Sequence, residues 1–203
     1  MPINQDTVHQ ELDHLRRMCP LGYFIGLHLR YMLPCYTYNS YPDAWMSLYQ
    51  RRSYIIQDPV FSWISAKAGQ VRWSDLAQEG KGEVFAQAAR FGLKYGAVVA
   101  HVDGDSRSFG SFARDDREFD DNEIRYLRSA IERLHVLTDI RAKLSKSDIE
   151  TIRAVENQSY SDAATQLGIA EVTVKHRIGT IRRKLQARDG KEIVFLAREA
   201  QII

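Results

Sequence analysis

Aromatic side chains and one carboxylate recur at regular spacing in the first half of the chain. Tyr41, Trp45 and Tyr49 are each four residues apart, so they share one face of a predicted helix. Asp58 and Trp73 follow. An indole N–H only donates hydrogen bonds, an ionised carboxylate only accepts them, and a phenol can donate. Gathered around one cavity, these groups could bind a small molecule that carries both donors and acceptors.

The same residues also have a purely structural interpretation. An aromatic stripe at helical spacing is usually part of a hydrophobic core. Asp58 followed by Pro59 is a common helix start, with Asp as the cap and proline at the first helical position. Residue types alone therefore leave a core and a binding site both open.

A second chemical signal is a basic run near the C-terminal end. Residues 173–188 contain no acidic side chain and these basic ones: Lys175, Arg177, Arg182, Arg183, Lys184 and Arg188. Such a local positive field favours a polyanionic partner. The simpler interpretation is a solvated basic face on a helical bundle.

The chain before residue 120 alternates between helical and strand-like patterns. Apolar residues three or four apart predict helices at 8–18, 44–51, 60–68 and 83–91. Alternating apolar residues predict a hairpin at 22–38, interrupted at Pro34, and a strand pair at 96–103 and 108–113. These elements predict a mixed α/β domain.

A long amphipathic helix is predicted at residues 122–144, after an acidic run at 115–121. Its apolar stripe either packs on its own domain or forms part of a dimer interface, and the sequence favours neither. Strand patterns then disappear and helices follow in quick succession. We therefore predict two domains, 1–142 and an all-α, four-helix domain at 143–203.

The basic run lies on the third helix of that second domain, at about residues 171–185. Four apolar residues on it are spaced to face inward: Val174, Ile178, Ile181 and Leu185. The outward positions are then Lys175, His176, Arg182 and Arg183. A tight turn at Gly168 joins this helix to a shorter one before it. Two helices joined in this way, the second one basic, suit entry into the major groove of DNA.

This end of the chain resembles the C-terminal helix-turn-helix domain of the LuxR family of transcription regulators. The resemblance runs through LSKSDIETIRAVENQSYSDAATQLGIAEVTVKHRIGTIRRKL and the closing EIVFLAREA. It implies that Lys175 and His176 enter the major groove. It also implies that Thr173, Arg177 and Arg182 help to hold phosphates.

The first domain resembles the autoinducer-binding domain of the same family. SYPDAWMSLYQRRSYIIQDPVFSWISAKAGQVRW contains the pattern Y-P-x-x-W-x-x-x-Y, D-P and a later W at unchanged spacing. FGLKYG and FGSFARDD also fit. The resemblance implies an α/β/α sandwich that encloses an N-acyl-homoserine lactone.

The resemblance also implies a role for each residue of the spaced set. Trp45 would donate to the lactone carbonyl, Tyr41 would donate to the amide carbonyl, and Asp58 would accept from the amide N–H. Ser111 would offer its hydroxyl to the acyl side. The remaining two would pack on the ligand: Tyr49 and Trp73.

The leading hypothesis is therefore an α+β bacterial quorum-sensing regulator. It would bind an inverted repeat in double-stranded DNA as a homodimer, under the control of a buried lactone. A buried carboxylate without a partner is costly. We therefore expect the ligand to stabilise the fold, by about 3 kcal/mol at a hundredfold excess over its Kd.

Two departures from the family pattern keep a second hypothesis open. Asn157 and Gln158 stand in a turn where glycine is usual, and Gly179 stands where a long groove-facing side chain is common. A family member that binds no lactone, or binds DNA poorly, could act by forming inactive heterodimers.

Other classes of function are not favoured. The six histidines are scattered and there is no nucleophile elbow, so we expect neither an enzyme nor a metal site. Cys19 and Cys35 both lie in apolar stretches and are expected to be buried, reduced thiols. The sequence has no signal-peptide pattern and no membrane-spanning run, and it predicts a cytoplasmic protein.

Overall fold

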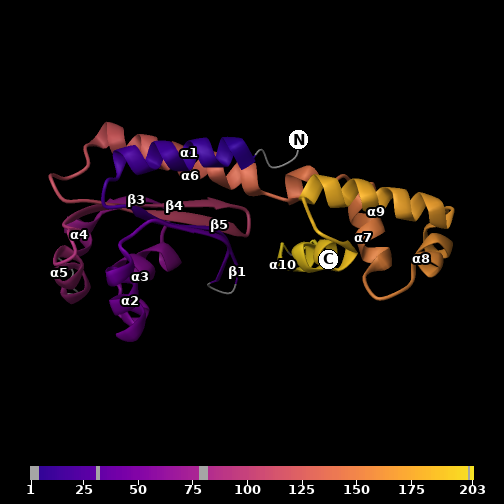
Figure 1. Cartoon of the computed structure of the whole chain (residues 1–203), viewed down its shortest axis with the longest axis horizontal. Coiled ribbons are helices and arrows are strands. Elements are labelled where there is room, and N and C mark those ends of the chain that lie inside the picture. Colours follow the sequence, from indigo (N-terminus) through magenta and orange to yellow (C-terminus); the bar gives the residue numbers. More distant parts are fainter. Residues whose placement is uncertain (1–4, 31–32, 78–81, 201) are drawn as a thin grey trace. The chain divides into compact units, whose positions relative to one another are not determined.

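The computed structural model describes residues 5–30, 33–77, 82–200 and 202–203 (Figure 1). The chain divides into two compact units, Asp6–His135 and one that contains Val136–Ile203. The division falls within one helix, so the boundary after residue 142 remains an interpretation of the sequence.

A five-stranded antiparallel sheet, in the order β2-β1-β5-β4-β3, forms the centre of the first unit. Its strands are β1 (Tyr23–Arg30), β2 (Leu33–Asn39), β3 (Gly69–Arg72), β4 (Tyr95–Asp103) and β5 (Ser106–Arg114). Phe24 of β1 lies opposite Ser111 of β5, and Gly26 lies opposite Phe109. Because residues two apart in a strand point to the same face, these four residues share one face of the sheet.

Helices cover both faces of this sheet (Figure 1). On one face lie α1 (Gln5–Met18) and α6 (Asp121–Thr138). The other face carries α2 (Asp43–Arg51), the 3-10 turn η1 (Tyr54–Ile56), α3 (Pro59–Ala66), α4 (Trp73–Ala77) and α5 (Glu83–Ala89). The mixed α+β architecture is as the sequence predicts.

The structure corrects the expected elements in two places. The elements β3 and α4 were not predicted from the sequence, because four and five residues are too few to show a clear period. The helix predicted at 122–144 ends at Thr138, and Arg141–Lys143 forms a separate 3-10 turn, η2. Asp139 accepts a hydrogen bond from the backbone N–H of Arg141 at 2.8 Å, a local bond that competes with continuation of the helix.

The edge strand β2 accounts for two further differences. Pro34 lies inside β2 and does not interrupt the hairpin, because an edge strand can place the missing N–H on its unpaired side. Cys35 on the same strand is exposed, so its predicted burial is wrong, whereas Cys19 is buried as predicted. The connection at residues 31–32 lies outside the described residues.

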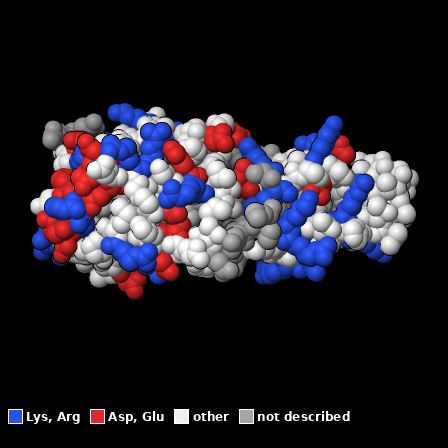
Figure 2. Space-filling view, turned by 90° about the horizontal axis from the view of Figure 1, so that it is seen from above, with Lys and Arg blue, Asp and Glu red and all other residues white. Residues whose placement is uncertain are grey.

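The second unit contains four helices where the sequence predicts them. They are α7 (Lys146–Val155), α8 (Tyr160–Leu167), α9 (Glu171–Leu185) and α10 (Gly190–Glu199). The inward residues of α9 are buried in a core that also contains Ile152 and Ile193. Ser145 and Asp148 form a capping box at the start of α7, and Gly168 ends α8 in the left-handed conformation. Lys and Arg side chains cover much of the visible face of this unit (Figure 2).

Candidate functional site

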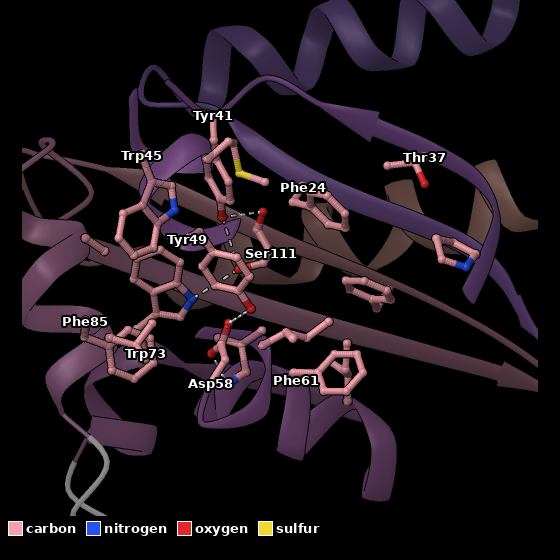
Figure 3. Close-up of a pocket in the computed structure, with 18 of the residues that line it drawn as sticks. Phe24, Thr37, Tyr41, Trp45, Tyr49, Asp58, Phe61, Trp73, Phe85 and Ser111 are labelled. Atoms are coloured by element: carbon pink, nitrogen blue, oxygen red, sulfur yellow. Dashed lines mark hydrogen bonds between the residues drawn. The ribbon is translucent and has the colours of Figure 1, made fainter. Parts of the chain in front are cut away.

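A cavity of about 320 Å³ lies between the sheet and helices α2 to α5 (Figure 3). This volume is at the lower end of the range of small-molecule sites. Its lining is mainly aromatic and aliphatic. The six residues expected at the ligand all line it: Tyr41, Trp45, Tyr49, Asp58, Trp73 and Ser111. The structure therefore brings together residues that lie up to seventy positions apart in sequence.

Asp58 is held by two hydrogen bonds at the wall of the cavity. It is the N-cap of α3, where its Oδ1 accepts from the backbone N–H of Val60 at 2.8 Å and Pro59 occupies the first turn. Its Oδ2 accepts from the Tyr49 hydroxyl at 2.7 Å. Asp58 therefore does cap a helix, as its position before Pro59 suggests. Its carboxylate also lines the cavity.

Burial is the largest influence on the pKa values of Asp58 and Tyr49. Loss of solvent raises the pKa of Asp58, and the hydrogen bonds from Tyr49 and from the backbone at Val60 act in the opposite direction. Burial and the nearby carboxylate both raise the pKa of Tyr49, so the phenol keeps its proton and acts as the donor. The expectation of a carboxylate without a partner is wrong, because Tyr49 already supplies one.

Two other polar side chains of the site, Tyr41 and Trp73, form hydrogen bonds to Ser111 on β5. The Tyr41 hydroxyl donates to the Ser111 carbonyl oxygen at 2.8 Å and lies 3.1 Å from its Oγ. The indole Nε1 of Trp73 donates to the same Oγ at 3.3 Å. A Cβ at Gly96 would lie 2.1 Å from the Trp73 ring, so glycine there makes room for the indole. Tyr41, expected to donate to a ligand, is hydrogen-bonded to the protein instead.

Trp45 is buried among other aromatic rings. Its ring centroid lies 6.0 Å from Tyr54, in a stacked arrangement, and 5.7 Å from Tyr49. Phe91 packs at 5.8 Å. Figure 3 shows the indole nitrogen on the side of the ring toward Tyr41. This position leaves the N–H at the cavity, where a ligand oxygen could accept from it.

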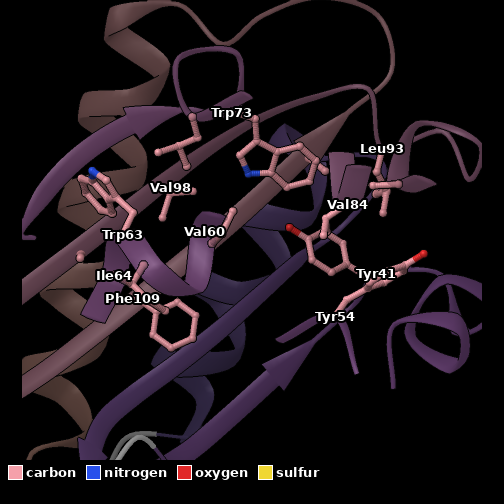
Figure 4. Packing of buried hydrophobic residues seen from close by; sticks show 14 of the residues in the cluster. Tyr41, Tyr54, Val60, Trp63, Ile64, Trp73, Val84, Leu93, Val98 and Phe109 are labelled. Atoms are coloured by element: carbon pink, nitrogen blue, oxygen red, sulfur yellow. The ribbon is translucent and has the colours of Figure 1, made fainter. Parts of the chain in front are cut away.

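Part of the site is formed by residues that were not predicted from the sequence. Phe24, Phe61, Phe85 and Phe109 line the apolar part of the cavity. Phe109 stacks near Phe24, with ring centroids 6.0 Å apart. The alternation of β1 and β5 was the available signal, because it places both residues on the sheet face that carries Ser111. Figure 4 shows Phe109 with Val60, Ile64 and Trp73 in the core around the cavity.

Most of the residues expected to contact DNA are accessible on α9. Four are exposed: Lys175, His176, Arg182 and Arg183. The Lys175 ammonium pairs with Glu171 one turn earlier at 2.6 Å. Thr173 and Arg177 are half-buried, and the Arg177 guanidinium lies 3.4 Å from the Thr151 hydroxyl of α7. The Arg177 side chain therefore points toward α7 and does not lie with the four exposed side chains.

The two departures from the family pattern have different structural consequences. Gln158 donates from its side-chain amide to the carbonyl of Ala154 at 2.6 Å, so it satisfies the end of α7 in the absence of glycine. A Cβ at Gly179 would meet no atom within 4 Å. The surface of α9 is therefore bare at this position.

Two further observations concern the described part of the chain. No helix in it is long and apolar enough to cross a membrane. Within the same residues, no group of three or more His, Cys, Asp or Glu side chains could hold a metal ion.

Known proteins resemble this chain over most of its length. Residues 4–140 match the family described as "Autoinducer binding domain". An HTH-type transcriptional regulator of Sinorhizobium fredii, y4qH, is 31% identical over an alignment of 163 positions that covers 72% of this chain. The chain spans 50% of the length of that relative. The regulatory protein SdiA of Escherichia coli is 25% identical over 219 aligned residues, with 98% of this chain and 90% of SdiA covered.

Solved structures of SdiA share the fold. A crystal structure of E. coli SdiA matches with a TM-score of 0.52 at 23% identity, over 98% of this chain and 91% of that one. SdiA in complex with octanoyl-rac-glycerol matches with a TM-score of 0.50 at 22% identity, over 96% and 89% of the two chains. The relatives are named as regulators and not as enzymes. Because the family match covers well over half of the residues, the chain belongs to the LuxR family of quorum-sensing transcription regulators, with an autoinducer-binding domain.

Proposed function

We propose that this chain is a DNA-binding transcription regulator that is controlled by an N-acyl-homoserine lactone held in the cavity. The observation that carries the proposal is the convergence of a buried carboxylate, two indoles, two phenols and a serine on one apolar cavity. The proposed sensor domain is 1–142 and the proposed DNA-binding domain is 143–203.

The polar groups of the cavity are complementary to an acylated lactone. Such a ligand has two carbonyl acceptors, one amide N–H donor and an apolar tail. In the proposed mode Trp45 donates to the lactone carbonyl, and Asp58 accepts from the amide N–H with a lone pair that Tyr49 and Val60 leave available. Tyr41 and Ser111 serve the amide carbonyl and the acyl side, after exchange of part of their mutual hydrogen bond. Tyr49 and Trp73 contact the ligand with their rings.

A monoacylglycerol is the second ligand class to consider, because SdiA has been solved in complex with octanoyl-rac-glycerol. A glycerol ester offers hydroxyl donors in place of the amide N–H, and Asp58 could accept from either group. Thermal unfolding of the full chain with octanoyl-homoserine lactone and with octanoylglycerol separates the two. A larger rise in Tm with the lactone supports the proposal, and a rise with the glycerol ester alone contradicts it.

The exposed side chains of α9 support the proposed DNA-binding role. Lys175 and His176 are proposed to read bases in the major groove, while Thr173, Arg177 and Arg182 hold phosphates and Arg183 adds positive charge. Binding requires Lys175 to leave Glu171 and Arg177 to leave Thr151. We propose a homodimer on an inverted repeat, acting in the cytoplasm.

A heterodimerising antagonist is the alternative function. The bare surface at Gly179 and the pairing of Lys175 with Glu171 favour it, because both reduce the contacts available to bases. Gel-shift selection from random duplexes, with lactone present and absent, tests the choice. Recovery of a palindromic sequence supports the regulator, and uniform weak binding favours the antagonist.

A further inference from the structure

One arm of the cavity is apolar and includes Phe109, which lies opposite Gly26 in the sheet. This arm, called the acyl arm below, is lined by Phe24, Phe61 and Phe109 and leads from Asp58 toward the edge strand β2. Figure 3 shows Thr37 of β2 and Asp58 on opposite sides of the pocket. The arm is therefore the part of the cavity suited to an extended hydrocarbon chain.

Gly26 does not itself line this arm but lies beneath the Phe109 ring, which does. It lies opposite Phe109 in the pairing of β1 with β5, on the sheet face that lines the cavity. A Cβ built on Gly26 would lie 2.5 Å from Cε1 of Phe109, 3.0 Å from its Cζ and 3.1 Å from Cβ of Pro34. The Phe109 ring therefore rests directly on the backbone of β1, in space that only glycine leaves free.

The outer end of the acyl arm is open. Leu33 on β2 lines the cavity on this side and is 72% exposed. A chain that passes Phe109 can continue past Leu33 toward solvent. The position of the Phe109 ring thus decides how far a chain can extend.

We propose that Gly26 sets the length of acyl chain that this receptor accepts, by allowing the Phe109 ring to lie directly against the backbone of β1. The inference rests on the proposed binding of an acylated lactone. A side chain in a strand points away from the sheet plane, so a methyl group at position 26 pushes the ring outward into the acyl arm. Phe24 stacks beside the ring, and Pro34 Cβ lies 3.1 Å from the position of a Cβ on Gly26, so there is little free space around that methyl group.

The test compares the full chain with Gly26→Ala across a series from butanoyl- to dodecanoyl-homoserine lactone, with affinity measured by calorimetry. Gly26 has an ordinary strand conformation, so alanine adds no backbone strain. Butanoyl lactone should bind as in the wild type. Decanoyl and dodecanoyl lactones should lose affinity on the order of tenfold, because one misplaced methyl group in an apolar pocket has effects of that size.

Gly110→Ala is the matched control. It lies on the neighbouring strand, and its Cβ would lie 2.4 Å from Cζ of Phe112 and 2.8 Å from Cδ1 of Ile131, on the opposite face of the sheet. This variant has a similar clash but leaves the acyl arm untouched. Any loss of affinity in it should be equal for all chain lengths.

Phe109→Leu provides an independent measurement if Gly26→Ala does not fold. Removal of the ring edge should raise the affinity for dodecanoyl relative to hexanoyl lactone. An unchanged ratio in Phe109→Leu, or an equal loss at every length in Gly26→Ala, overturns the role of Gly26. If the wild type binds no lactone in the series, the proposed function itself fails, whatever the variants do.

Discussion

The Tyr49 hydroxyl donates to Oδ2 of Asp58 at 2.7 Å, so the carboxylate at the cavity wall is paired before any ligand enters. The same carboxylate caps α3 through Val60. Ligand binding therefore adds a third partner to a group that is already satisfied, and the fold does not depend on the ligand to remove an unpaired buried charge.

Tyr49→Phe should destabilise the folded chain by about 1–3 kcal/mol, the usual effect of removing one partner of a buried polar group. Urea denaturation without ligand measures the change. Tyr54→Phe is the control, since Tyr54 packs in the same aromatic cluster and has no bond to Asp58 among those described. An equal loss in both variants would contradict a special role for the Tyr49 hydroxyl.

The effect of Tyr49→Phe should also depend on pH. The pKa of Asp58 in the folded chain lies above its ordinary value of 3.8, so the folded state binds the proton more tightly than the unfolded state. The contribution of Asp58 to the free energy of unfolding is therefore lost as the pH rises from 3.8 through the pKa of the folded state. Loss of the Tyr49 bond raises that pKa further. The difference in unfolding free energy between wild type and variant should shrink as the pH falls toward 4.

Asp58→Asn should abolish lactone retention while the chain stays folded. Asparagine caps helices as well as aspartate does, but its amide presents a donor where the ligand N–H needs an acceptor. Asp189→Asn is the matched control, because Asp189 caps α10 by accepting from the N–H of Glu192 at 2.9 Å. Calorimetry with octanoyl-homoserine lactone measures both. Undiminished binding by Asp58→Asn would remove Asp58 from the ligand site.

Trp45→Phe should weaken lactone binding by about 1–2 kcal/mol, because the phenyl ring keeps most of the packing and only the indole donor is lost. Trp63→Phe is the control: Trp63 belongs to the same core cluster but does not line the cavity. Equal losses of affinity in the two variants would show that Trp45 acts only by packing.

Substitutions on α9 should separate base readout from phosphate contact. Lys175→Ala and His176→Ala should each lower the preference for operator over random DNA, by about 1–3 kcal/mol per lost base contact. Arg182→Ala should weaken binding to all sequences and make the salt dependence shallower by about one unit of log-log slope per half-site.

Fluorescence anisotropy on operator and scrambled duplexes at several salt concentrations measures these effects. Lys191→Ala, on α10, is the control for a general loss of positive charge. Wild-type affinity and salt slope in all three α9 variants would mean that the basic run is only a solvated face. The spacing of half-sites in the operator should be about 34 Å or a multiple of it.

The sequence predicted six of the residues that line the cavity, but it did not predict the hydrogen bonds between them. The four-residue spacing of Tyr41, Trp45 and Tyr49 predicted one face of a helix, but α2 begins at Asp43, so only Trp45 and Tyr49 lie on it and Tyr41 precedes it. All three side chains nevertheless line the cavity. The bonds of Tyr49 to Asp58 and of Tyr41 to Ser111 join different elements, so no spacing along the chain reveals them. β3 and α4 were missed for a related reason, since short elements are defined by the sheet and core on which they pack.

The central claim, a lactone receptor built on Asp58, is tested most directly by native mass spectrometry of the full chain. Wild type and Asp58→Asn are purified from cells supplied with equal amounts of octanoyl-homoserine lactone and octanoylglycerol. The account predicts one lactone on each wild-type chain and none on Asp58→Asn. Wild-type chains without lactone, or equal lactone on both proteins, would contradict it.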